Sequence, residues 1–140
     1  MWILLVEDDA KQAELIEKAL QEAFPDVEVR HYSTESQFRE SLPRLVEHPP
    51  ALIVMDVMLR WCDAGPDMPL QPRECEDFSM AGVRCCRLLK SNPKTRNVPV
   101  VVLTVLDKNG FGLPTGCVHA SKASDFKALI NAANHLITRM

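Results

Sequence analysis

Short, nearly uninterrupted apolar segments recur along the chain, at Trp2–Val6, Ala51–Met55 and Val98–Leu103. Each is rich in valine, isoleucine and leucine, a pattern typical of strands that are buried on both faces of a parallel sheet. Val27–Tyr32 alternates between apolar and polar residues, which favours an edge strand, and Cys117–Ala120 is a weaker candidate. The pattern therefore predicts five strands.

Amphipathic helices are predicted between these strands, because apolar residues recur there at three- to four-residue spacing. The predicted helices cover residues 10–24, 34–46, 82–90 and 124–138, and Pro43 is expected to kink or restart the second of them. Strands that alternate with helices in this way predict an α/β fold, in which helices cover both faces of a parallel sheet.

Two stretches have no apolar period. Trp61–Ser79 carries three prolines and five acidic residues, and so long an irregular loop in a compact domain is usually functional or disordered. Asp107–Gly116 stands where the alternation requires a helix, but its glycines and its proline oppose a regular one. We therefore expect an inserted loop over residues 61–79 and a fourth helix that is shortened or irregular.

Composition indicates an ordinary globular protein. The chain has 140 residues, with 16 lysines and arginines against 19 aspartates and glutamates, which gives a formal net charge of −3. This balance disfavours nucleic-acid binding, and no apolar run approaches the roughly 20 residues of a membrane span. The N-terminal residues lack the basic region of a signal peptide, and the five cysteines lack zinc-site spacing, so reduced thiols are expected. We therefore expect one cytoplasmic domain over residues 1–140.

Polar residues end the predicted strands. Glu7–Asp9 follow the first strand, Asp56 follows the third, Thr104 ends the fourth and Lys122 follows the fifth. Binding sites in an open parallel sheet form outside the carboxyl ends of the strands, so these side chains are expected to converge. Taken singly, each has an ordinary explanation, such as a helix cap for an acid that follows a strand. Taken together, converging carboxylates raise each other's pKa, and a divalent cation such as Mg²⁺ relieves this repulsion.

Four segments carry a resemblance to a known family: ILLVEDD (3–9), LIVMDVML (52–59), VVVLT (100–104) and HASK (119–122). In this order they resemble the receiver domain of bacterial two-component response regulators. Residues 82–104 also resemble the third helix and fourth strand of that family, so the resemblance covers nearly the whole chain. It implies a flavodoxin-like (βα)5 fold, a doubly wound parallel sheet of five strands in the order 2-1-3-4-5.

The resemblance implies a role for each polar strand end. Asp56 matches the phospho-acceptor aspartate of the family. Glu7 and Asp8 match the acidic pair at the Mg²⁺ site, where Asp8 binds the ion directly and Glu7 binds it through water. Asp56 and the backbone carbonyl of Met58 complete the implied ligand set.

Three further residues match family positions. Thr104 matches the switch hydroxyl, and Lys122 matches the lysine that pairs with a phosphoryl oxygen, or with Asp56 before reaction. His119 stands where the family has an aromatic switch residue, and a partly buried strand residue without that role is an equal alternative. Asp9 falls just after the acidic pair and is expected to cap the next helix.

The implied function is signalling, since a receiver catalyses only its own phosphorylation and dephosphorylation and is not otherwise an enzyme. Such a stand-alone receiver takes a phosphoryl group from a sensor histidine kinase or a histidine phosphotransfer protein. It then contacts a downstream protein. A homodimer is also compatible with the sequence. The main alternative is a receiver-like adaptor that binds partners without phosphorylation. An aspartate-nucleophile phosphatase is disfavoured because Met58 stands where a second acid is needed, and a flavin carrier because no phosphate-binding loop follows the first strand.

The chain departs from the family pattern at several points. Val105 stands where the family has a small residue. Ala123 stands where the family has a proline that follows the lysine through a cis peptide bond. Both changes favour the adaptor. A trans bond is expected here, because a non-proline cis bond costs about 2.5–4 kcal/mol. The inserted loop Trp61–Ser79 follows Arg60, which replaces a proline. It is expected at the rim of the site, either as a lid or docking element or as a passive insertion, and its scattered apolar residues could anchor on a neighbour.

Overall fold

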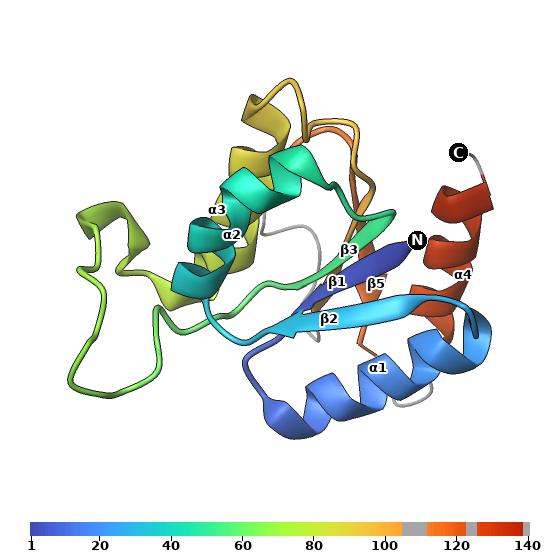
Figure 1. Ribbon diagram of the computed structural model, residues 1–140, viewed down its shortest axis with the longest axis horizontal. Coiled ribbons are helices and arrows are strands. Elements are labelled where there is room, and N and C mark those ends of the chain that lie inside the picture. Colours follow the sequence, from blue (N-terminus) through green and yellow to red (C-terminus); the bar gives the residue numbers. More distant parts are fainter. Residues whose placement is uncertain (105–111, 123–125, 139–140) are drawn as a thin grey trace.

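The structure is a computed structural model that describes residues 1–104, 112–122 and 126–138. Strands and helices alternate along the chain, as the sequence pattern predicts (Figure 1). They are β1 (Trp2–Val6), α1 (Ala10–Ala23), β2 (Glu28–Tyr32), α2 (Glu35–Glu47), β3 (Leu52–Asp56), the short 3₁₀ helices η1 (Arg73–Cys75) and η2 (Phe78–Met80), α3 (Ala81–Ser91), β4 (Val100–Thr104), β5 (Cys117–Ser121) and α4 (Lys127–Thr138). None of the described helices is long and apolar enough to cross a bilayer.

All five strands belong to one parallel sheet, in the order β2-β1-β3-β4-β5. This is the order that the resemblance implies, and the flavodoxin-like fold is confirmed. Helices α1 and α4 cover one face of the sheet, and α2 and α3 cover the other (Figure 1). Because all the strands run in the same direction, their carboxyl ends meet at one edge of the sheet.

Two predicted helices differ in detail from the observed structure. Helix α2 runs through Pro43 without a break, so the helix does not restart there. It loses the hydrogen bond that a proline nitrogen cannot donate, and buried residues such as Phe38 and Leu45 hold it against the sheet. Between β4 and β5, residues 112–114 have no regular structure and residues 115–116 form a turn. The remainder of the stretch predicted to contain a shortened helix, residues 107–111, lies outside the described residues.

Two apolar cores lie on opposite faces of the sheet. Alternating residues of β1 divide between them, since Ile3 and Leu5 belong to the core under α1 and α4, whereas Leu4 and Val6 belong to the core under α2 and α3. All four side chains are completely buried, and the same holds for the first four residues of β3. The residues that follow these two strands therefore leave a close-packed and rigid support.

Gly82 brings the first turn of α3 against the backbone that follows β3. Its N–H donates to the carbonyl of Val57 over 2.8 Å. A Cβ atom at this position would lie 2.1 Å from the carbonyl oxygen of Asp56, a distance that no real side chain tolerates. The returning end of the inserted loop is therefore fixed directly behind Asp56, and only glycine permits this approach.

The inserted loop is also held by a buried ion pair. Glu35, at the start of α2, is completely buried and pairs through both carboxylate oxygens with Arg84 of α3, at 2.7 and 3.0 Å. The same guanidinium donates to the carbonyl oxygens of Asp77 at 2.7 Å and Cys75 at 3.3 Å. One arginine thus joins α2, α3 and the two short 3₁₀ helices of the loop.

The departing end of the loop caps α2. The carbonyl groups of Arg60 and Trp61 accept hydrogen bonds from the backbone N–H groups of Glu35 and Ser36, at 3.0 and 2.8 Å. These donors lie in the first turn of the helix, where no intrahelical partner exists. The indole N–H of Trp61 donates to the carbonyl of Pro69 over 3.0 Å, which folds the loop back on itself.

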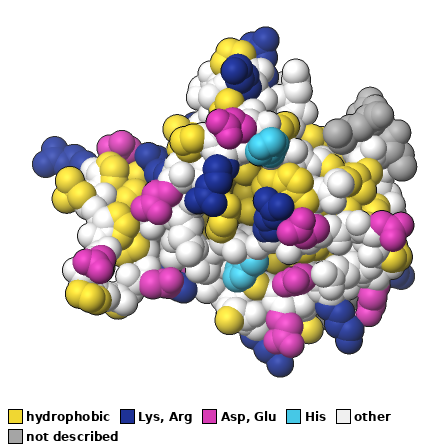
Figure 2. Space-filling model, in the orientation of Figure 1, with side chains coloured by type: hydrophobic (Ala, Val, Ile, Leu, Met, Phe, Trp, Pro, Cys, Tyr) yellow, Lys and Arg dark blue, Asp and Glu magenta, His cyan; other side chains and the backbone are white. Residues whose placement is uncertain are grey.

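Most of the large apolar residues in the loop do not anchor it to the described chain. Leu70 is 92% exposed, Phe78 60% and Met68 59%, while Cys75 is the loop residue that is buried. The loop projects from the body of the molecule, and hydrophobic and acidic side chains gather on the projecting lobe (Figure 2). Polar contacts, rather than apolar anchors, therefore fix its two ends.

Substitution of Gly82 is the first test of this arrangement. Gly82→Ala is expected to lower the free energy of unfolding by about 3 kcal/mol, because the added methyl group meets backbone atoms that cannot yield without moving Asp56. Urea denaturation measures the change. The matched control is Gly65→Ala, where a Cβ meets nothing within 4 Å and the change should stay within about 0.5 kcal/mol. Equal midpoints for the two variants would contradict the close approach.

Arg84→Leu is expected to destabilise the chain by about 3 kcal/mol, because it leaves the Glu35 carboxylate buried without its main partner. It should also speed tryptic cleavage after the exposed Arg73, since the loop loses two hydrogen bonds from the guanidinium. Arg87→Leu, on the exposed side of the same helix, is the control and should change neither quantity. Unaltered cleavage in Arg84→Leu would show that the loop is held in another way.

Candidate functional site

The polar residues that follow the strands lie at one edge of the sheet. Glu7 follows β1, Asp56 ends β3, Thr104 ends β4 and Lys122 follows β5. Val6 lies opposite Met55 in the pairing of β1 with β3, so Glu7 and Asp56 leave neighbouring strands at the same level. The parallel sheet thus brings together residues that are far apart in the sequence.

Glu7, Asp8 and Asp56 form a compact cluster of carboxylates. One oxygen of each lies within 4.8 Å of the others. Glu7 is 1% exposed and the Asp56 side chain 13%, so water screens their repulsion poorly. Three oxygen ligands at this spacing fit a hard divalent cation such as Mg²⁺, which binds carboxylates and retains water ligands. Met58, whose carbonyl the resemblance adds to the ligand set, lies half-buried in the loop after Asp56.

Lys122 supplies the positive charge of the site. Its ammonium forms an ion pair with the carboxylate of Glu7, and its Nζ lies 3.5 Å from Oδ2 of Asp56. Its backbone N–H donates to the carbonyl of Thr104 over 3.0 Å, which extends the pairing of β4 with β5. The sequence argument anticipates a pair with Asp56, and the structure adds Glu7 as the closer partner.

Burial and mutual repulsion change the acidity of these groups. Burial, together with the contact with Glu7, raises the pKa of Asp56 from its ordinary 3.8 to about 8, against the opposing charge of Lys122. Burial likewise raises the pKa of Asp8. For Lys122, burial opposes the charged form, but the hydrogen bond to Glu7 and the nearby carboxylates raise its pKa overall. Without a cation, burial and repulsion therefore favour the protonated form of Asp56 and the charged form of Lys122.

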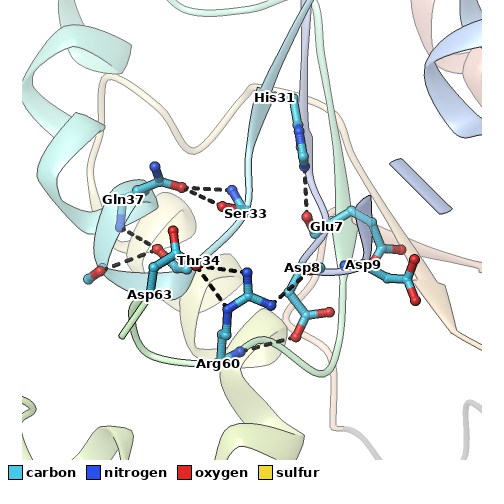
Figure 3. Close-up of polar contacts among 10 residues, drawn as sticks. Glu7, Asp8, Asp9, His31, Ser33, Thr34, Gln37, Arg60 and Asp63 are labelled. Carbon is cyan, nitrogen blue, oxygen red and sulfur yellow. Dashed lines mark hydrogen bonds and ion pairs between the residues drawn. The ribbon is translucent and has the colours of Figure 1, made fainter. Parts of the chain in front are cut away.

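Arg60 holds Asp8 in place and connects it with the inserted loop (Figure 3). Its backbone N–H donates to the Asp8 carboxylate over 3.3 Å, and its guanidinium donates to the Asp8 carbonyl over 2.9 Å. The same guanidinium pairs with Asp63 at 2.8 Å. The sequence marks Arg60 only as a replaced proline, and no local pattern indicates a contact between residues 52 positions apart.

Glu7 is fixed through its backbone and its carboxylate. His31, at the edge strand β2, has Nε2 2.7 Å from the carbonyl oxygen of Glu7 (Figure 3). The N–H of Asp9 donates to the Glu7 carboxylate over 3.2 Å. The carboxylate of Asp9 accepts from the N–H of Gln12 and caps α1, so the predicted cap is confirmed. His31 lies on the predicted edge strand, but nothing in the local sequence indicates its contact with Glu7.

The two residues assigned to switching occupy neighbouring strands. Thr104 is 3% exposed and follows Leu103, which lies opposite Asp56 in the pairing of β3 with β4. His119 is half-buried on β5, and its buried Nε2 has no hydrogen-bond partner among the described residues. This burial agrees with the strand interpretation of His119, and its switching role stays a prediction.

Val105 and Ala123, which depart from the family pattern, lie outside the described residues. The same holds for the peptide bond between Lys122 and Ala123.

Comparison with curated proteins finds the response regulator PleD of Caulobacter vibrioides, which is 32% identical over 127 residues. The alignment covers 89% of this chain and 22% of PleD, so the chain spans a small part of that relative's length. No family model matches the chain.

The solved structures that resemble this chain are also receiver domains or response regulators. The receiver domain of a signal transduction histidine kinase from Syntrophus aciditrophicus is 26% identical, with a TM-score of 0.67 over 99% of this chain and 91% of that one. The Mn²⁺-bound response regulator Rcp1 (19% identity, TM-score 0.57, 98% and 89% coverage) and the phosphorylated cyanobacterial phytochrome response regulator RcpA (20%, 0.62, 96% and 89%) share the fold. At these lower identities the two latter comparisons bear on the fold alone.

The raised pKa of Asp56 predicts a stability that falls with increasing pH when chelator removes divalent cations. The unfolded chain ionises Asp56 near pKa 3.8 and the folded chain near 8, so the unfolded state gains stability as the pH rises through that window. Asp56→Asn removes this titration, and it should raise the free energy of unfolding by at least about 1 kcal/mol at a pH of about 9, as measured by urea denaturation with chelator.

The exposed Asp67 provides the control for this experiment. Asp67→Asn should follow the pH dependence of the unchanged chain. If Asp56→Asn did the same, the buried carboxylate cluster would not be the source of the pH dependence.

Proposed function

We propose that this chain, which belongs to the receiver domains of response regulators, accepts a phosphoryl group on Asp56 and signals by contact with other proteins. The observation that supports this most strongly is the convergence of three carboxylates and one ammonium at the carboxyl edge of a rigid sheet. Residues 1–140 are proposed to act as one receiver domain, whose chemistry is limited to its own phosphorylation and dephosphorylation.

Asp56 is the proposed nucleophile. It ends β3, whose other residues are completely buried, so its backbone is held firmly, while its side chain keeps 13% exposure on the solvent side. One carboxylate oxygen attacks the phosphorus atom of a phosphorylated donor, the donor's leaving group departs, and an acyl phosphate remains on Asp56. The attack requires the ionised carboxylate, whereas the raised pKa favours the protonated form in the absence of a cation.

The carboxylate cluster is the proposed metal site. Asp8 and Asp56 would bind a divalent cation directly, with Glu7 acting through water and the Met58 carbonyl as a further ligand. When bound, Mg²⁺ offsets the negative charge that gathers on the nucleophile and on the phosphoryl oxygens. The two hydrogen bonds from Arg60 orient Asp8 before any ligand arrives. Rcp1, which shares the fold, was itself solved in a Mn²⁺-bound form.

Lys122 and Thr104 are proposed to respond to the new phosphoryl group. The Lys122 ammonium already lies between Glu7 and Asp56, so phosphoryl oxygens on Asp56 would compete with Glu7 for it. The hydroxyl of Thr104 would donate to another phosphoryl oxygen and draw the end of β4 inward. His119, which pairs with Val102 on the adjacent strand, is proposed to follow that movement.

The proposed partners follow from the same chemistry. A sensor histidine kinase or a histidine phosphotransfer protein would supply the phosphoryl group, and a downstream protein would read the phosphorylated form. The inserted loop follows Arg60, which binds Asp8, and it exposes Leu70, Phe78 and Met68 for contact with a partner. The loop thus fits a docking element that senses the acid cluster through Arg60.

Phosphorylation by a small-molecule donor tests the proposal. Incubation with acetyl phosphate and Mg²⁺ is expected to add the mass of one phosphoryl group in intact-mass spectrometry, and chelator or Asp56→Asn should abolish the addition. Asp8→Asn should weaken Mg²⁺ binding, measured by calorimetry, by at least about tenfold. The matched control is Asp9→Asn, because Asp9 caps α1 next to the cluster and asparagine caps equally well.

Two outcomes would contradict the proposal. Phosphoryl uptake by Asp56→Asn would place the acceptor elsewhere. Absence of uptake by the unchanged chain, with Mg²⁺ bound and the fold intact, would favour the adaptor that acts without phosphorylation.

A further inference from the structure

Two cysteines meet on the face of the sheet that α2 and α3 cover, at the ends of the strands opposite to the carboxylate cluster. Cys86 lies in α3 and is completely buried, and Cys117 is the first residue of the edge strand β5 and is half-buried. Cys117 packs against the apolar core that contains Cys86, and the two thiols are hydrogen-bonded. Both are free thiols in the structure.

The backbone around both residues fixes this contact. Gly116, with φ at +95°, turns the chain into β5, and a Cβ on it would lie 3.3 Å from the side chain of Lys90. Lys90 lies one turn after Cys86 on α3, so the start of β5 runs along the same side of the helix. Cys117 also pairs with Val100 of β4. The contact between the thiols therefore follows from a tight turn, a helix face and a strand pair.

The two thiols differ in acidity. The hydrogen bond that Cys86 donates lowers the pKa of Cys117, and the charge of Lys90 lowers it further. The Lys90 ammonium is held there, because it donates to the carbonyls of Arg96 and Val98 at 2.9 Å each. The same hydrogen bond and complete burial raise the pKa of Cys86. Cys117 is therefore the more nucleophilic and the more accessible sulfur of the pair.

We propose that Cys86 and Cys117 are a site of reversible oxidation by a hydroperoxide, at which they form an intramolecular disulfide. The Cys117 thiolate attacks the terminal peroxide oxygen, the O–O bond breaks, and a sulfenic acid forms while the leaving oxygen takes a proton. The Cys86 sulfur then attacks the Cys117 sulfur, the S–O bond breaks, and water leaves with the Cys86 proton. The two sulfurs lose two electrons, and the peroxide gains them.

The other cysteines lack this arrangement. Cys85 neighbours Cys86 on α3 but faces Glu35 and Cys75, and burial raises the pKa of both Cys85 and Cys75. Cys62 lies half-buried in the inserted loop. Cys85 is therefore a matched comparison for Cys86, since it is equally buried on the same helix but turned to another neighbour.

The disulfide would link two elements that lead to the carboxylate cluster. The first turn of helix α3 lies behind Asp56 at Gly82, and β5 ends next to Lys122. Oxidation would therefore fix the separation of these two elements, whereas the reduced pair leaves them joined only by packing. The chemistry of the pair does not depend on phosphorylation, so its test uses no phosphoryl donor.

Peptide mapping of the full chain tests the proposal. The reduced protein is treated with hydrogen peroxide, remaining thiols are alkylated, and tryptic peptides are analysed by mass spectrometry. Peptide 85–87 is expected to be cross-linked to peptide 109–122, and dithiothreitol should release both. Since peptide 85–87 contains two cysteines, the variants identify the partner. Cys85→Ala should keep the cross-link, while Cys86→Ala and Cys117→Ser should lose it.

Three results would overturn the proposal: a cross-link that survives in Cys86→Ala, a cross-link found only between two chains, or peroxide treatment that leaves both peptides alkylated. Cys86→Ala empties a core position and could unfold the chain, so Cys117→Ser, at a half-buried position, tests the same pair independently. Circular dichroism establishes that each variant is folded before oxidation.

Discussion

Repulsion among three carboxylates, held close together by a rigid sheet, is the constraint around which this structure is organised. Glu7, Asp8 and Asp56 cannot move apart, because the four residues before Glu7 and the four before Asp56 are completely buried. Three features relieve the repulsion. The ammonium of Lys122 lies close to Glu7 and Asp56, and the protonated form of Asp56 is favoured. The oxygen cluster also fits a cation. Each of these features can offset the repulsion in place of another.

The inserted loop is accommodated by charge rather than by a core of its own. Glu35 and Arg84 form a buried ion pair, and a buried pair of this kind contributes more to a defined geometry than to net stability. Arg60, just before the loop begins, likewise fixes the loop by a polar contact, because its guanidinium donates to the carbonyl of Asp8. Loop residues as apolar as Leu70 are left exposed, so the lobe presents them to the surroundings.

Periodicity was sufficient to predict the elements of this fold, because each strand and helix is specified by its own local pattern. The apolar segments Trp2–Val6 and Ala51–Met55 are uninterrupted because both faces of each strand are buried, and that burial is visible in the sequence. The strand order came from the resemblance to receivers. The polar strand ends could be anticipated because all parallel strands finish at one edge.

Long-range contacts could not be anticipated in the same way. The contacts of Arg60 with Asp8 and of Arg84 with Glu35 join elements whose separation depends on the finished packing. Gly82 looks like an ordinary glycine near a helix start until the backbone of Asp56 is placed beside it. The pairing of Cys86 with Cys117 likewise depends on how β5 lies against α3. The two ends of the inserted loop are fixed, and this has a consequence for how far its sequence can vary among related proteins. The chain is tied to α2 at Trp61 and to Arg84 of α3 at Cys75, and closure entropy grows slowly with length. The segment between these ties can therefore be lengthened, shortened or exchanged, in evolution or by protein engineers, while the carboxylate cluster stays in place.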